Sequence, residues 1–202
     1  MLGAQTPLWR ALLLGRSLRL RVTAGGQYGA LVSDGQLYRL VRSVWLHADA
    51  LHLLVNVVSI VVIGRLLEPW VGAVRLWWWF VLGGVVGSVA SQLAGLSQSD
   101  GASGGAFALF GALTLICWRA RDRFDAEDAP LVRWWLPGFL LLNLVISFAL
   151  PFVDGIAHLG GLSVGLLVGA VASPQRPARW VTGLELLGTG GLVGLALCGP
   201  LL

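Results

Sequence analysis

Long apolar runs, separated by short polar connections, restrict what this chain can fold into. Several of them approach the ~20 residues that a helix needs to cross the hydrocarbon core of a bilayer. Of the 202 residues, 56% are hydrophobic and 12% are charged, whereas soluble domains carry about 25% charged residues. Spans in lipid must be helices or a closed barrel, and continuous apolar runs select helices. The sequence therefore predicts an all-α, polytopic membrane helix bundle.

Five core spans and one extra span are expected from these runs. A polar connection over 65–75 is expected to separate the first two core spans. The small-residue series Gly83, Gly87 and Ala90 in the second span suits close contact between helices. The core spans are predicted at 47–64, 76–96, 103–118, 134–150 and 156–172, and the extra run covers 180–202.

The chain is expected to have three parts: an N-terminal segment 1–23, a membrane domain 24–173, and a linker with an extra C-terminal transmembrane helix over 174–202. Segment 1–23 is leucine-rich but holds four arginines, each costing roughly 2.5–3.5 kcal/mol at mid-membrane. These arginines do not gather on one helix face, so a degenerate first span and a surface helix remain alternatives. We expect no cleavable signal peptide and a surface loop over 24–46.

Charge and cysteine content exclude several classes of function. All fourteen basic residues are arginines in scattered positions, and nucleic-acid binding would need a dense basic patch. Cys117 and Cys198 both lie in apolar runs, where free cysteines behave as small hydrophobic residues, and their spacing offers no metal site. We therefore expect no nucleic-acid partner and no bound metal.

The arginines also predict an orientation. Eight of the fourteen occur in the connections after the first, third and fifth core spans, whereas 98–101 and 151–155 have no basic residue. Loops rich in arginine face the cytoplasm under the positive-inside rule. The ends of the spans that bear His52, Ser103 and His158 are therefore expected to face outside, at one membrane level.

A serine and a histidine at one level can form a catalytic pair. Ser103 lies between glycines in Gly101-Ala102-Ser103-Gly104 and begins an apolar run, while His158 begins another. Serine is a poor nucleophile at neutral pH until a base takes its proton, and His158 can be that base. A serine flanked by glycines is also common in turns, so a turn without catalytic function is the alternative interpretation.

Donors for a developing oxyanion are expected around Ser103. Its backbone N–H lies at a helix N-terminus, and His52 and Asn56, four residues apart, share a helix face. Polar groups in a span are candidates for function by default, although interhelical hydrogen bonds are the structural alternative. His47 is predicted to point away from His52 and to have a structural role.

Small residues are expected to bring the serine and histidine helices together. Gly161, Gly165 and Gly169 follow His158 at four-residue spacing, and a matching small face follows Ser103. Such faces let helix backbones approach closely, although any one glycine is explained as well by generic packing. The face on the serine helix consists of Gly104, Ala108 and Gly111.

The order of these motifs along the chain resembles that of the rhomboid intramembrane serine proteases. The resemblance runs from about Tyr38 to Ala172. It includes Tyr38-Arg39, which is similar to an aromatic–arginine pair of the family's first outer loop, and Leu67-Glu68, similar to an acidic element after the histidine-bearing span. The matching pieces are His47-x4-His52-x3-Asn56, Gly101-Ala102-Ser103-Gly104 with Phe110-Gly111, and Ala157-His158-Leu159-Gly160-Gly161 with Gly165.

The resemblance implies a Ser103–His158 dyad and an oxyanion hole from the Ser103 backbone, His52 and Asn56. It also implies supporting roles for His47 and the motif glycines, and cleavage of transmembrane segments of other membrane proteins near the outer face of the lipid bilayer. No metal or cofactor is expected. Region 24–173 would then be a rhomboid-like membrane protease domain, and we expect a bacterial inner membrane with the active site facing the periplasm.

Two other functions remain as alternatives. One is a catalytically inactive rhomboid-like protein that binds membrane clients, but such relatives lose the serine or the histidine, and both are present here. The other is a transporter or channel that uses His52, Asn56 and His158 as a polar pathway. That class predicts ionisable residues near mid-membrane and internal repeats, and the sequence has neither.

Overall fold

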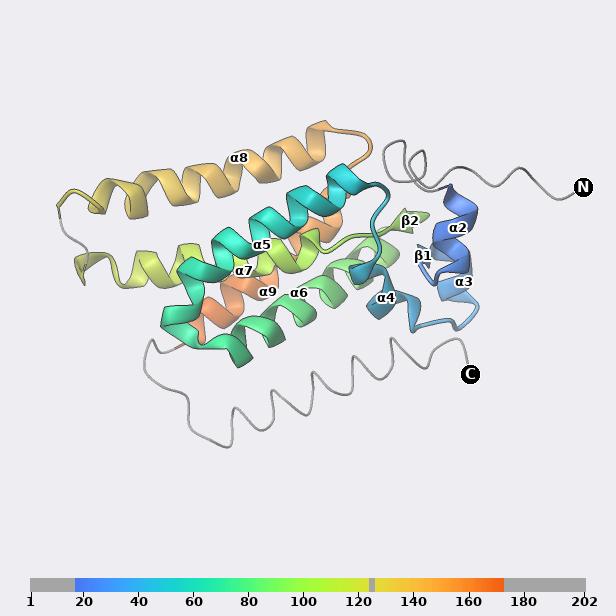
Figure 1. Cartoon of the computed structure of the whole chain (residues 1–202), viewed down its shortest axis with the longest axis horizontal. Helices are drawn as coiled ribbons and strands as arrows, with labels where there is room; N and C mark the ends of the chain where they lie inside the picture. Colours follow the sequence, from blue (N-terminus) through green and yellow to red (C-terminus); the bar gives the residue numbers. More distant parts are fainter. Residues whose placement is uncertain (1–16, 124–125, 173–202) are drawn as a thin grey trace, which may run out of the picture.

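The predicted all-α bundle is confirmed by a computed structural model, which describes residues 17–123 and 126–172 (Figure 1). Segment 1–16 and the run 180–202 lie outside the described residues, so the expected extra span is not placed. The five long helices are α5 (Ala50–Val71), α6 (Ala73–Leu93), α7 (Ser103–Arg119), α8 (Leu136–Ala149) and α9 (Gly155–Val171).

Within residues 17–123 and 126–172, three helical segments are long and apolar enough to cross a membrane. They are α5, α6 and Leu131–Ala149, which consists of the π-helical turn η3 (Leu131–Trp135) and α8. Helices α7 and α9 are shorter, at 17 residues each, and are also apolar. These lengths and compositions make the chain a multi-pass membrane protein.

Helix α5 differs from its expected bounds at both ends. It begins at Ala50 rather than His47, because the Asp49 carboxylate accepts a hydrogen bond from the backbone N–H of His52, 2.7 Å away, and caps the helix. It then continues to Val71, so the polar connection expected over 65–75 was wrong. Buried Leu67 provides the reason, since tertiary packing holds the last turns in the bundle despite their charged residues.

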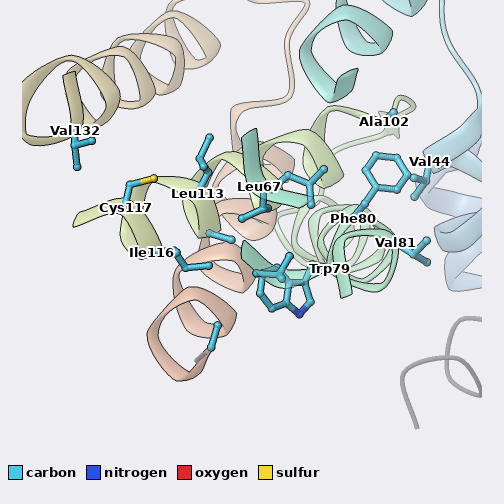
Figure 2. Close-up of a cluster of buried hydrophobic side chains, with 14 residues drawn as sticks. Val44, Leu67, Trp79, Phe80, Val81, Ala102, Leu113, Ile116, Cys117 and Val132 are labelled. Carbon is cyan, nitrogen blue, oxygen red and sulfur yellow. The ribbon is translucent and has the colours of Figure 1, made fainter. Parts of the chain in front are cut away.

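The central helix of the described bundle is α7, which packs against α5, α6 and α9. Most of its residues from Gly104 to Cys117 are buried. The main hydrophobic cluster extends along the bundle from Val44 and Ala102 to Ile116 and Cys117, with Phe80 and Trp79 between them (Figure 2). Apolar burial inside the bundle is therefore concentrated around the helix that begins with Ser103.

Helices α7 and α9 run side by side at very close approach, with a register that repeats every four residues. A Cβ atom on Gly161 would meet the backbone of Gly104, and one on Gly165 would meet the backbone of Ala108. One on Gly169 would lie 3.1 Å from Cα of Ala112. Small residues at each step let the two backbones touch. The face expected on α7 includes Gly111, where a Cβ atom would lie 3.2 Å from the carbonyl oxygen of Leu162 on α9, and Ala112 adds to this face.

Helices α5 and α8 leave large apolar side chains exposed. On α5, Leu51 is 69% exposed and Leu54 is 58% exposed, and on α8 Leu141 is 61% exposed. Only Leu140 and Ser147 are buried on α8. In a bilayer these apolar faces contact lipid chains, which is why a helix can be apolar all round and still lie at the edge of the bundle.

The segment 17–46, which we call the N-terminal platform, lies at one end of the bundle (Figure 1). The surface loop expected over 24–46 was wrong, because this region is built of short ordered elements. Its strand β1 (Gln27–Tyr28) pairs antiparallel with β2 (Gln98–Ser99), which lies in the connection that leads to Ser103. The platform consists of α2 (Leu18–Thr23), β1 (Gln27–Tyr28), α3 (Gly29–Ser33), α4 (Arg39–Arg42) and the 3₁₀ turn η1 (Ser43–Trp45).

Buried Arg39 joins the parts of this platform. Its guanidinium donates hydrogen bonds of 2.8 Å to the backbone carbonyls of Val22 and Gly26, and of 2.7 Å to the side-chain oxygen of Gln36. The planar, multiply donating arginine head suits such bridging of carbonyl groups. Arg39 of α4 therefore holds α2, through Val22, and the residue directly before β1, Gly26.

Candidate active site

The turn before Ser103 is shaped by Gly101. Its φ angle is 137°, a conformation that L-residues rarely adopt. Its N–H donates a hydrogen bond of 3.0 Å to the carbonyl of Ser43 in the platform. A Cβ atom at this position would lie 2.8 Å from Cε1 of His52. Glycine therefore lets the turn lie directly against the His52 ring.

His47 holds the next residue of this turn. Its Nε2 accepts a hydrogen bond of 3.3 Å from the backbone N–H of Ala102. Its ring meets that of His52 edge-on, with the ring centroids 5.1 Å apart. The expectation that His47 points away from His52 was therefore wrong. The reason is that His47 precedes α5, so helical spacing does not apply to the pair.

His52 and Asn56 lie on one face of α5, beside Gly101. The Asn56 side chain is 5% exposed, and its amide nitrogen donates a hydrogen bond of 3.0 Å to the carbonyl of His52. An asparagine amide has two N–H donors, so one remains for a ligand. The side chains expected to stabilise an oxyanion are therefore placed against the turn that leads to Ser103.

Ser103 is the first residue of α7, and its side chain is half-buried. Ala102 is the N-cap, and it has no side-chain group that could accept a hydrogen bond from the first turn. The first N–H groups of a helix have no partner within the helix. The serine hydroxyl is thus placed next to backbone donors that can bind an anion.

His158 lies in the first turns of α9, which begins where the Asp154 carboxylate accepts a 2.8 Å hydrogen bond from the N–H of Ala157. The His158 ring is 7% exposed and stacks on Phe107 of α7, with centroids 4.3 Å apart and planes 18° apart. Its Nδ1 lies 2.6 Å from Oγ of Ser147 on α8. Nδ1 is thus the ring nitrogen that contacts α8.

Ser103 and His158 are brought to the same end of α7 and α9 by the contact between Gly104 and Gly161. Within the described ranges no hydrogen bond joins the two side chains. Catalytic hydrogen bonds are often long in the absence of substrate and tighten when it binds. Ser103 and His158, both among the described residues, therefore lie at one end of the same helix pair without a direct hydrogen bond between their side chains.

Two residues of the site were missed in the sequence. Phe107 follows Ser103 by four residues and so lies on the same face of α7, a spacing that would have revealed it. Ser147 is a polar residue inside an expected span, and this alone marks a candidate. Its contact with His158 depends on where α8 packs, which no local pattern in the sequence gives.

Metal ligands do not gather at the site. In residues 17–123 and 126–172, no group of three or more histidine, cysteine, aspartate or glutamate side chains could hold a metal ion. Cys117 is buried in the hydrophobic cluster toward the opposite end of α7. The described site therefore consists of serine, histidine and asparagine side chains with backbone donors.

Asp100 connects the platform to the turn before Ser103. Its carboxylate accepts hydrogen bonds from the backbone N–H of Gln27 at 3.0 Å and from the guanidinium of Arg21 at 3.1 Å. Burial raises the pKa of Asp100, although the Gln27 and Arg21 donors act in the opposite direction. The folded chain therefore binds this proton more tightly than the unfolded chain does.

This pKa shift predicts how stability changes with pH. The free energy of unfolding should decrease as the pH rises from the ordinary aspartate range through the raised pKa. Asp100→Asn has no proton to lose, so its melting temperature in detergent should lack that decrease as the pH is raised above about 4. Asp34→Asn, at an exposed position, is the control and should behave as wild type. Equal pH dependence of wild type and Asp100→Asn would contradict the prediction.

Fold and site together define a polytopic helical membrane protein with serine, histidine and asparagine side chains gathered at one end of its bundle. The sequence profile of the Rhomboid domain matches residues 34–175, which is more than half of the chain. The chain belongs to the rhomboid family.

Curated relatives extend this result. RHOMBOID-like protein 5 of Arabidopsis thaliana is 34% identical over 82% of this chain and 53% of its own length. Rhomboid protease GluP of Bacillus subtilis is 28% identical over 87% of this chain and 34% of its own length. Inactive RHOMBOID-like protein 8 of Arabidopsis is 29% identical over 74% of this chain and 42% of its own length. The chain thus spans about half the length, or less, of these relatives, and the names include both a protease and an inactive protein.

Proposed function

We propose that this chain is an intramembrane serine endopeptidase that cleaves transmembrane segments of membrane proteins with a Ser103–His158 dyad. The observation that carries the proposal is the close contact of α7 and α9, in which Gly104 meets Gly161. Ser103 precedes the first of these glycines by one residue, and His158 precedes the second by three. The two side chains therefore lie at one end of the same helix pair.

The reaction would follow the chemistry of serine acyl transfer. As Oγ of Ser103 attacks the carbonyl carbon of the scissile bond, Nε2 of His158 takes its proton. The tetrahedral intermediate collapses when His158 gives that proton to the leaving amine. His158 then takes a proton from water, whose oxygen attacks the acyl carbon. As the bond from that carbon to Oγ of Ser103 breaks, His158 gives the proton to Oγ. In every step Nε2 of His158 carries the proton, and Oγ of Ser103 is the only protein atom that bonds covalently to the substrate.

The oxyanion would be bound beside the Gly101 turn. The candidate donors are the backbone N–H of Ser103, the free amide N–H of Asn56 and the ring of His52. Donors placed in advance in a site shielded from water lower the barrier for charge that develops on the carbonyl oxygen. We propose supporting roles for His47, Gly101, Gly104, Gly161 and Gly165 in holding this geometry.

Asn56→Ala should reduce kcat without abolishing cleavage. If Asn56 is one oxyanion donor among three, its removal costs no more than about 10²–10³-fold in kcat. The rate is measured on a transmembrane substrate in liposomes, with the melting temperature of the variant recorded alongside. A folded Asn56→Ala enzyme with wild-type kcat would contradict the assignment.

The orientation is proposed from the described arginines near the helix ends opposite Ser103 and His158, which outnumber the four arginines of the platform (Arg19, Arg21, Arg39 and Arg42). Those near the opposite ends are Arg65, Arg75, Arg119, Arg121, Arg123 and Arg133. Positive loops favour the cytoplasmic side, so we propose that the site faces outside. The relatives compared are mostly from Arabidopsis, so the expected bacterial inner membrane is not supported, and we assign no particular membrane. We retain 24–173 as the proposed protease domain, flanked by 1–23 and 174–202.

The alternative is a catalytically inactive protein that binds membrane clients, as the name of one relative illustrates. Cleavage distinguishes the two. Wild type and Ser103→Ala are each reconstituted in liposomes with single-span substrates that carry small residues near the outer face, and the products are mapped by mass spectrometry. Cleavage near that face by wild type alone supports the protease. Substrate binding without cleavage by folded wild type favours the client-binding alternative.

A further inference from the structure

Ser147 is one of only two buried residues on α8, a helix whose other side chains are partly or fully exposed. Its side chain is 4% exposed and faces His158, itself 7% exposed, across the contact between α8 and α9. The distance from Oγ of Ser147 to Nδ1 of His158 is 2.6 Å. Such a short contact between buried polar atoms is a hydrogen bond, and its direction determines the chemistry of the ring.

The direction follows from where the serine hydrogen goes. Oγ of Ser147 also lies 2.7 Å from the backbone carbonyl oxygen of Asn143, one turn earlier on α8. A carbonyl oxygen can only accept, so the single hydrogen of the hydroxyl is donated to it. Oγ must then accept from His158, which means that Nδ1 carries a hydrogen and that Nε2 has the free lone pair.

We infer that Ser147 is a positioning residue that holds His158 in the Nδ1–H tautomer, with Nε2 free to take the proton of Ser103. The inference deepens the proposed function and rests on it. A neutral imidazole has two tautomers, and the partner of one nitrogen sets the state of the other. Only the Nδ1–H tautomer leaves Nε2 as a base. Without Ser147, a fraction of the enzyme molecules would therefore carry the ring hydrogen on Nε2, which could not then accept the proton of Ser103.

Residues of three helices determine the position and the tautomer of the His158 ring. His158 belongs to α9, Phe107 of α7 stacks on its face, and Ser147 of α8 binds its edge. Phe107 fixes the plane of the ring but has no polar atom, so it cannot choose the tautomer. That choice depends on α8 being packed against α9, and thus the position of a lipid-facing helix is coupled to the state of the base.

The test measures the tautomer of His158 directly by ¹⁵N NMR. The chain has only three histidines, so selective ¹⁵N-histidine labelling gives six ring signals, and those missing in His158→Ala belong to His158. Protonated and unprotonated ring nitrogens have well-separated ¹⁵N shifts. We expect Nδ1 of wild-type His158 to be protonated at neutral pH. In Ser147→Ala the population should move toward Nε2–H, while Ser147→Thr, whose hydroxyl can make the same bond to Asn143, should restore the wild-type state.

Kinetics provide the second readout. Ser147→Ala should lower kcat by about 10- to 100-fold with KM unchanged, less than the about 10⁴-fold lost when a charged partner is removed from a soluble triad. Ser147→Thr should recover most of that loss. Ser163→Ala is the matched control, because it removes an exposed hydroxyl of α9 that donates to the carbonyl of Gly160. It should leave both tautomer and kcat unchanged.

Two results would overturn the inference: a wild-type His158 with its hydrogen on Nε2, or a Ser147→Ala enzyme with wild-type tautomer and kcat. The first result is measured on wild type alone. The inference can therefore be refuted even if Ser147→Ala does not fold. If wild type is folded but cleaves nothing, the proposed function fails. The ¹⁵N spectra of wild type and Ser147→Thr then still decide whether Ser147 sets the tautomer.

Discussion

Ser103→Ala, His158→Ala and the double variant are expected to lose proteolysis to the same extent, about 10⁴-fold or more. The nucleophile and its base act as a unit, because a serine without a base stays protonated and a base without a serine has no proton to take. Removing the second group after the first therefore has little further effect. Ser103→Ala should keep the wild-type melting temperature. The two variants that lack His158 should melt lower, because they lose a buried ring that stacks on Phe107.

The measurement is cleavage of a transmembrane substrate in liposomes over long incubation. Ser163→Ala serves as the control for removing a hydroxyl from an apolar helix, and it should cleave at the wild-type rate. Full activity in folded Ser103→Ala would exclude Ser103 as the nucleophile. If the double variant were much slower than either single variant, the two residues would be acting independently, which contradicts a dyad.

Gly161→Ala should both destabilise the protein and reduce its activity. The added Cβ would overlap the backbone of Gly104, with its Cα only 3.0 Å away. Backbone atoms cannot rotate aside as a flexible side chain can, so α7 and α9 must separate at the level of Ser103 and His158. Overpacking of this kind typically costs about 1–3 kcal/mol and occasionally more. The separation would also lengthen the path of the proton from Ser103 to His158.

Gly138→Ala is the matched control for this prediction. A Cβ atom at Gly138, on α8, would have nothing within 4 Å. Alanine is also favoured over glycine inside a helix by about 1 kcal/mol, so this variant should be neutral or slightly stabilised. Thermal unfolding in detergent and cleavage in liposomes are measured for both variants. Wild-type stability and activity in Gly161→Ala would contradict the close contact of α7 and α9.

The membrane class and the positions of the main site residues were predictable because each depends on local composition. Apolar runs locate spans through their length, and arginines mark one end of those spans. Ser103, His52 and His158 then fall at the other end by sequence position alone. This reasoning needs no knowledge of which helices touch.

Features set by distant contacts were not predictable in the same way. Arg65 and Glu68 look like a connection, but the burial of Leu67 against other helices extends α5 beyond them. The platform contains turn residues, yet Arg39 organises it through carbonyls 13 and 17 residues earlier in the chain. The partner of His158 was missed for the same reason, because Ser147 reaches the ring only through the packing of α8.

The central claim is that Ser103 is an activated nucleophile, and covalent labelling tests it most directly. Detergent-purified wild type, Ser103→Ala and His158→Ala are each treated with a fluorophosphonate probe, and the modified residue is identified by mass spectrometry. We predict a single adduct on Ser103 in wild type and no adduct in either variant. A folded wild-type protein that takes no label, or a label that persists in Ser103→Ala, would contradict the account.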